Sequence, residues 1–143
     1  MDSQTKEQIL TYLKTQSRNK IVFYKDNIFD FSALDVGHCL AQAIYNLKDE
    51  RKLPMKVLSE LDLILSDAIT NHNTYGRILA IDNIGILFEP DLKQDINILF
   101  ERYSNNNVLF VKWDGEINNG NLYFLTKEKG IKINIKNLSH III

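Results

Sequence analysis

The sequence predicts an α/β fold of three layers, with a mostly parallel central sheet and an antiparallel C-terminal extension. Three apolar segments are typical of buried strands, namely Ile21–Tyr24, Arg77–Asp82 and Val108–Trp113. Helical patterns separate them, and alternation of strands with helices favours a parallel sheet because parallel neighbours need a crossover connection. Three shorter strand candidates come after these, and they predict the extension: Leu122–Leu125, Ile131–Ile135 and Ile141–Ile143.

Four helices are expected between the strands. The spacing of apolar residues indicates a short amphipathic helix over Thr5–Lys14 and a second over Ala33–Asn46, with Ser32 and Asp35 as a capping box. A third begins near Pro54 and carries apolar residues as far as Ile69. For the fourth, Pro90 suits a first turn, and the asparagines at 105–107 end the pattern.

Composition narrows the classes of function. The chain has 143 residues, of which 45% are hydrophobic and 24% charged, which predicts one globular domain over residues 1–143. A formal charge of −1 gives no support to nucleic-acid binding. No apolar run approaches the roughly 18 residues of a membrane span. The single cysteine and a start without signal-peptide features predict a cytoplasmic protein.

The residue best placed to take part in chemistry is Asp82, at the end of an apolar strand. In nucleotide-hydrolysing P-loop proteins an aspartate in this position holds magnesium, so Asp82 is a weak candidate metal ligand. The alternative is a structural hydrogen bond at a strand end. The next residue, Asn83, cannot serve as a general base because an amide does not take up a proton near neutral pH.

The phosphate-binding half of such a site is missing from the sequence. No glycine is followed by lysine and then serine or threonine, so there is no GxxxxGK[ST] motif. After the first strand the chain reads YKDNIFDFS, which places acids and aromatic rings where backbone amides would cradle phosphate. No cofactor is therefore expected.

A second candidate region lies where the next parallel strand ends. Trp113, Asp114 and Gly115 should lie at the same sheet end as Asp82, where α/β folds usually bind ligands. We therefore predict a nucleotide or partner site made of Asp82, Asn83, Trp113 and Asp114. The alternative for Trp113 is a packing role at the edge of the core.

The remaining polar residues favour structural roles. His38 and Cys39 would point about 100 degrees apart on a helix, and Cys39 is expected in the core with His38 facing solvent. His72 and His140 lie in loop-like polar surroundings without metal-ligand spacing. Three neighbouring acids could suggest a metal cluster, but they are expected at the first turn of a helix on dipole grounds alone: Glu89, Asp91 and Asp95.

Part of the chain resembles BrxF, the small P-loop protein of type 3 BREX phage-defence systems. The matching positions comprise a strand end, a helix start and a later turn: Asp82, Asn83, Ile84, Leu87, Phe88, Pro90, Leu92, Asp95, Leu99, Ser104, Asn105, Trp113 and Gly115. An earlier stretch also has the layout of the family, with Leu40, Arg51, Lys52 and Pro54. The resemblance covers about two thirds of the chain and implies a prokaryotic defence context.

The chain departs from this family at the positions that carry its chemistry. The Walker A phosphate loop is absent between Tyr24 and Ser32, Gly85 stands in place of the usual glutamate, and Asp114 replaces proline. The resemblance thus implies a degenerate P-loop-like domain without ATPase activity. We expect a non-catalytic interaction or regulatory subunit with protein partners, using the sheet end or the apolar tail at 141–143, and self-association remains open. The alternative is an ATPase-like component whose nucleotide or metal site is completed by a partner chain.

Overall fold

The computed structural model describes residues 2–45, 51–124 and 131–143, except for the side chain of Ile131. It confirms an α/β fold with a mostly parallel central sheet and a separate antiparallel sheet. The central sheet has the order β2-β4-β5-β1-β9, with β3 paired to β4. Its strands are β1 (Lys20–Tyr24), β2 (Leu34–Asp35), β3 (Thr70–His72), β4 (Gly76–Asp82), β5 (Val108–Lys112) and β9 (Ile141–Ile142). All pairs are parallel except the β3–β4 hairpin.

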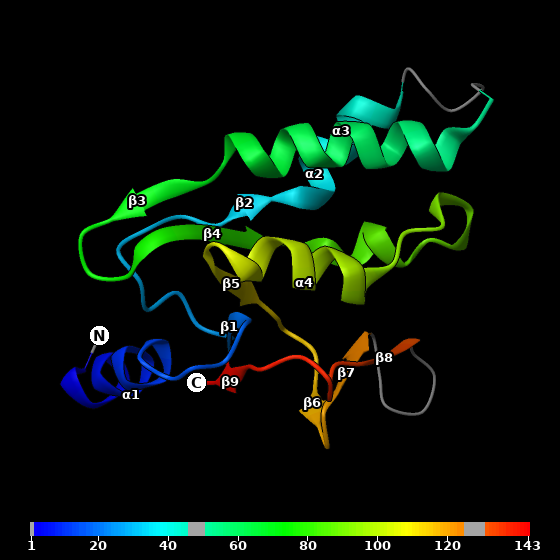
Figure 1. Cartoon of the computed structure of the whole chain (residues 1–143). Coiled ribbons are helices and arrows are strands. Elements are labelled where there is room, and N and C mark those ends of the chain that lie inside the picture. The colour runs from blue at the N-terminus through cyan, green and yellow to red at the C-terminus, as the bar shows by residue number, and fades with distance from the viewer. Residues whose placement is uncertain (1, 46–50, 125–130) are drawn as a thin grey trace.

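The strands alternate their side chains between two apolar layers, as the pleat requires. On one face, Phe23, Leu79 and Val111 pack against three helices, which are α2 (Val36–Tyr45), α3 (Leu53–Asp67) and α4 (Ile96–Asn105). On the other face, Val22, Ala80 and Phe110 pack against α1 (Ser3–Leu13). Figure 1 shows α2 and α3 on one side of the strands and α1 on the other. The sheet is therefore the middle of three layers.

The antiparallel extension is built from β6 (Ile117–Asn118), β7 (Asn121–Phe124) and β8 (Ile131–Asn134). Figure 1 shows these strands as a small unit beside the central sheet. Leu122, Ile135 and Leu138 belong to the same apolar cluster as α2, α3 and α4. The extension thus shares a core with the central sheet. Residue Leu125 of the predicted strand lies outside the described residues.

The C-terminal tail forms a strand, as predicted, but in the central sheet and not in the extension. Residues Ile141 and Ile142 form β9, which pairs in parallel with Val22 and Phe23 at the edge of the central sheet. The N–H of Ile143 also donates to the carbonyl of Phe23 at 3.0 Å. The ladder satisfies backbone groups that would otherwise face solvent, so the tail is already part of a sheet within this chain.

Two predicted helix starts are wrong. The second helix begins at Val36, because Leu34 and Asp35 pair with β4 as a strand, and Asp35 caps the helix by accepting from the His38 N–H at 2.9 Å. Asn46, its predicted end, lies outside the described residues. Pro90 starts only a 3₁₀ turn, η2 (Pro90–Leu92), which comes after η1 (Ile84–Phe88). The fourth helix begins at Ile96 with Asp95 as its cap.

Candidate functional site

The carboxyl ends of three neighbouring parallel strands bring charged and polar side chains together. Tyr24 ends β1 opposite Lys112, which ends β5, and the next strand, β4, ends at Asp82. Because parallel strands share one direction, these three residues lie at the same end of the sheet. The prediction that Asp82 and the residues after β5 share one sheet end is therefore confirmed. This is also the end at which α/β proteins commonly bind ligands.

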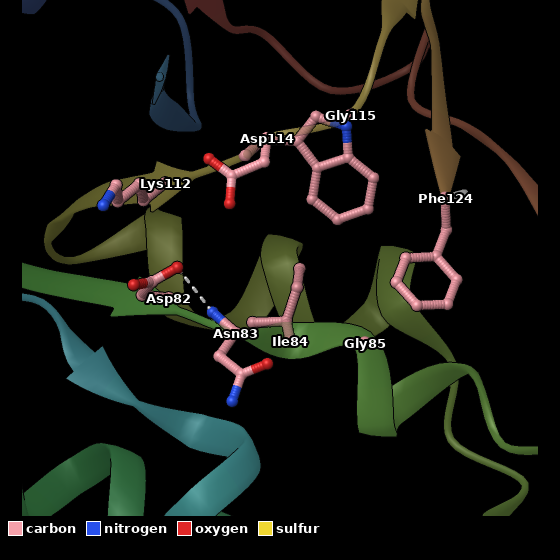
Figure 2. Close-up of a pocket in the computed structure, with 9 residues that line it drawn as sticks. Asp82, Asn83, Ile84, Gly85, Lys112, Asp114, Gly115 and Phe124 are labelled. Carbon is pink, nitrogen blue, oxygen red and sulfur yellow. Dashed lines mark hydrogen bonds between the residues drawn. The ribbon is translucent and has the colours of Figure 1, made fainter. Parts of the chain in front are cut away.

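A cavity of about 280 Å³ opens at this end, and we call it the carboxyl-end cavity. Figure 2 shows its lining, which comes from the end of β4, the end of β5 and the extension. The lining residues are Asp82, Asn83, Ile84, Gly85, Lys112, Trp113, Asp114, Gly115 and Phe124. All four predicted site residues therefore line one cavity, together with Gly115, which was predicted at the same sheet end, and four others that were not predicted.

Asn83 has a structural explanation. Its backbone is left-handed, with φ 55°, a conformation that asparagine tolerates better than most residues. Its N–H donates to Asp82 Oδ1 at 2.7 Å, and its side-chain amide donates to Asp35 Oδ1 at 2.8 Å. A Cβ at Gly37 would lie 2.5 Å from the Asn83 amide nitrogen, so the glycine is needed for this close approach. Asn83 thus ties β4 to the start of α2.

Asp35 is held in its charged form by these contacts. The His38 N–H, and then the Asn83 amide, lower the pKa of Asp35 below its ordinary value of 3.8. The negative charge also lies at the start of α2, where it faces the positive end of the helix dipole. Asp35 is therefore a structural carboxylate beside the cavity and not part of its lining.

Trp113 belongs to the core and to the cavity wall at once. Its side chain is buried, and its ring packs edge-on against Phe88 at 5.9 Å and near Phe124 at 6.4 Å. Its indole N–H donates to the Glu116 carbonyl at 3.4 Å. A Cβ on Gly85 would come within 2.8 Å of the Phe124 ring, so the absence of a side chain at 85 leaves room for this aromatic wall.

A second cavity, of about 370 Å³, lies on the other side of Asp82 and Lys112. Its remaining lining residues are Tyr24, Asn27, Phe29, Phe31, Ser32 and Ala33. Burial, and then the negative charge of Asp82, raise the pKa of Tyr24 to about 12. The Tyr24 hydroxyl therefore keeps its proton at physiological pH and is a hydrogen-bond donor toward this cavity.

The segment after β1 is packed against the sheet by two aromatic side chains. Phe29 and Phe31 stack on each other with centroids 4.7 Å apart, and both meet the ring of Phe110 on β5, at 5.1 and 4.9 Å. Between them, Asp30 accepts a hydrogen bond from His72 Nε2 at 2.8 Å. That bond lowers the pKa of Asp30. Aromatic packing thus holds the segment after β1 against β5.

The histidines and the cysteine differ in part from expectation. His72 is not in a loop, because it ends β3, stacks on Tyr75 at 5.0 Å and accepts the Thr74 and Tyr75 N–H groups at Nδ1. His140 meets the ring of Phe23 at 5.6 Å and hydrogen bonds the Leu138 carbonyl. His38 is exposed as predicted.

Cys39 is a free thiol that is only partly buried, whereas the sequence predicted a fully buried core residue. Among the described residues, no three His, Cys, Asp or Glu side chains gather as a metal site would require. In the same part of the chain, no helix has both the length and the apolar character needed to cross a bilayer.

Reasoning from the sequence missed Tyr24, Lys112 and Phe124. The first two carried a usable signal, since each lies at the carboxyl end of an apolar strand and therefore at the same end of a parallel sheet as Asp82. No sequence pattern indicated Phe124, because it reaches the cavity from a separate sheet. Comparison of the chain with protein-family models, curated proteins and solved structures finds no match.

Proposed function

We propose that this chain is a non-catalytic interaction or regulatory subunit that binds another protein at the carboxyl-end cavity. The observation that carries the proposal is the packing of Phe29 and Phe31 on Phe110, in the segment where a nucleotide-hydrolysing relative would need its phosphate loop. Phosphate binding needs several backbone N–H groups directed at one point, usually with a lysine. The segment has no glycine and its aromatic side chains pack on β5, which argues against such a loop.

Charge argues in the same direction. The segment contributes Asp26 and Asp30, and Asp82 stands at the shared border of both cavities. A triphosphate placed there would meet these three carboxylates, which Lys112 in both linings and Lys25 in the segment offset only in part. The carboxyl-end cavity, by contrast, combines aromatic rings with charged groups, as the centres of protein interfaces often do.

The cellular setting is part of the same proposal. The resemblance to BrxF suggests a prokaryotic anti-phage defence system, and the partners would then be products of neighbouring defence genes. The partly buried free thiol of Cys39 is compatible with a reducing compartment such as the cytoplasm. We propose no membrane or nucleic-acid partner.

The proposal is tested by capture of partners from cells that express the neighbouring genes. Tagged wild-type protein should retain a neighbouring gene product, and Asp114→Ala, at an exposed position of the cavity, should weaken that retention. Asp91→Ala, at an exposed position that lines neither the carboxyl-end cavity nor the second cavity, is the matched control and should have no effect. Retention of nothing by the wild type, with the protein monomeric, contradicts the proposal.

One observation favours the alternative of a composite nucleotide or metal site. Within the described residues, the side chain of Asp82 accepts only the N–H of Asn83, which leaves oxygen lone pairs free for a metal, and the Tyr24 hydroxyl is a nearby donor. A partner chain would have to supply the phosphate contacts. Equilibrium dialysis of ATP and magnesium against the captured complex decides between the two: retention that Asp82→Ala abolishes supports the composite site.

A further inference from the structure

The last row of side chains on the α1 face of the sheet forms one wall of the second cavity. Tyr24 ends β1 opposite Lys112 on β5, and Asp82 ends β4 beside Lys112. Each of the three lies two positions after a residue that packs toward α1, and alternate residues of a strand share a face. Their side chains therefore stand in the order Asp82, Lys112, Tyr24 across neighbouring strands, and all three line this cavity.

Tyr24 brings an unused hydrogen-bond donor to this wall. The residue is only 5% exposed, yet its hydroxyl has no hydrogen-bond partner among the described residues. Buried polar groups normally have one. Unlike the Tyr75 hydroxyl, the Tyr24 hydroxyl is not sealed inside the core, so it opens to the cavity. Because it keeps its proton at physiological pH, it can donate to an acceptor placed there.

Lys112 and Asp82 bring opposite charges that do not satisfy each other. Both are partly buried, and Figure 2 shows them at the same end of the carboxyl-end cavity. In the part of the chain that the structure describes, no ion pair joins them, the Lys112 ammonium makes no hydrogen bond, and Asp82 accepts only the N–H of Asn83. The two charges cancel within the lining, so a ligand that carries one charge of each sign suits this cavity.

The opposite wall comes from the segment after β1. Phe29 and Phe31 cover Phe110, one row before the end of the sheet, so the final row stays open to the cavity. Asn27 and Ser32 line this wall, and within the described residues their side chains make no hydrogen bond. The cavity volume of about 370 Å³ lies in the range of about 300–1,000 Å³ that is usual for small-molecule sites.

We infer that the second cavity binds a free α-amino acid with a polar, uncharged side chain. The carboxylate of the ligand accepts from the Tyr24 hydroxyl and the Lys112 ammonium, and its α-ammonium donates to Asp82. Neighbouring strands are about 4.8 Å apart, a spacing that suits a molecule with both charges on one carbon. The ligand side chain then meets Asn27 and Ser32. This site goes beyond the proposed docking function and does not depend on it.

The test is a titration of isotope-labelled protein with L-glutamine, followed by the backbone amide signals in NMR spectra. N-acetyl-L-glutamine lacks the ammonium and stands for the carboxyl terminus of a protein, whereas L-glutamine α-amide lacks the carboxylate and stands for an amino terminus. We expect saturable shifts at 27–33 and at Lys112 with L-glutamine, and none at Gly85 or Phe124, which line only the carboxyl-end cavity of the two. Each analogue should bind about tenfold more weakly or worse, because it loses a charge-assisted hydrogen bond.

Variants identify the groups that hold the ligand. Tyr24→Phe keeps the ring and its aromatic contacts but removes the hydroxyl, and it should weaken L-glutamine binding about tenfold. Asp82→Asn should have a similar effect, and its amide oxygen can still accept the Asn83 N–H. Asp91→Asn, at an exposed position outside both cavities, is the control and should leave binding unchanged. The unliganded amide spectrum of each variant checks that it has folded.

Several results would overturn the inference. The first is the absence of a saturable shift with L-glutamine. The second is binding of either analogue as tightly as L-glutamine, since the cavity would then recognise a single charge, as at a chain terminus. The third is full affinity in both Tyr24→Phe and Asp82→Asn, or shifts confined to Gly85 and Phe124, because the ligand would then lie elsewhere. None of these results changes the capture experiment, which tests the docking function separately.

Discussion

Replacing Tyr75 by phenylalanine should stabilise the protein. Tyr75 is only 6% exposed, and its hydroxyl oxygen is buried without a hydrogen-bond partner among the described residues. Its ring stacks on His72 at 5.0 Å and meets Phe110 at 5.4 Å, contacts that phenylalanine keeps. A buried unpaired polar group costs about 1–3 kcal/mol, so we expect Tyr75→Phe to raise the free energy of unfolding by about 1 kcal/mol and Tm by about 3 °C.

Tyr12 offers a matched control for this experiment. It is similarly buried, at 8% exposure, but its hydroxyl donates to the Asn19 carbonyl and accepts from the Ile21 N–H, at 3.1 and 3.0 Å. Tyr12→Phe should therefore lower the free energy of unfolding by about 1–3 kcal/mol. Urea unfolding followed by circular dichroism measures both variants. If Tyr75→Phe destabilises the protein as Tyr12→Phe does, the hydroxyl is hydrogen bonded and the reasoning is refuted.

Three further predictions concern other parts of the fold. Tyr103→Phe removes a 2.6 Å hydrogen bond to Asp62 and should cost about 1.5 kcal/mol in urea unfolding, and an unchanged midpoint would argue against that bond. Gly76→Ala should cost about 1–2 kcal/mol because φ is +79° there, although nothing obstructs a Cβ, and Gly76→Asn should cost less. The pKa of Asp35 is lower in the folded state than its ordinary value of 3.8. The charged carboxylate therefore stabilises the fold above pH 3.8, and this stabilisation is lost as pH falls through the folded-state pKa. The Tm difference between wild type and Asp35→Asn should accordingly shrink on acidification from about pH 6 to about pH 3.

The parallel core could be predicted because its signal is local. Apolar runs such as Ile21–Tyr24 are strand-like wherever they occur, and their separation by helices leaves few topologies. The same logic placed Asp82 and Trp113 at one sheet end. Fold class and the outline of the cavity could thus be predicted from patterns within single segments.

The errors have physical reasons that a single segment does not reveal. Leu34 and Asp35 share the helical spacing of the residues after them, but β4 offers their backbone groups ladder partners. The tail at Ile141 became a sheet edge because β1 lacked a second neighbour, and Phe124 reached the cavity through a sheet whose position depends on tertiary packing. Long-range pairing decided each of these cases.

Calorimetric titration of the chain alone with ATP and magnesium is the most direct test of the central proposal, that the segment after β1, packed by aromatic rings, does not form a phosphate-binding loop. The packing of Phe29 and Phe31 predicts no binding heat for the wild type and none for Asp82→Ala. Stoichiometric binding of the triphosphate by the wild-type chain, lost in Asp82→Ala, would contradict the claim.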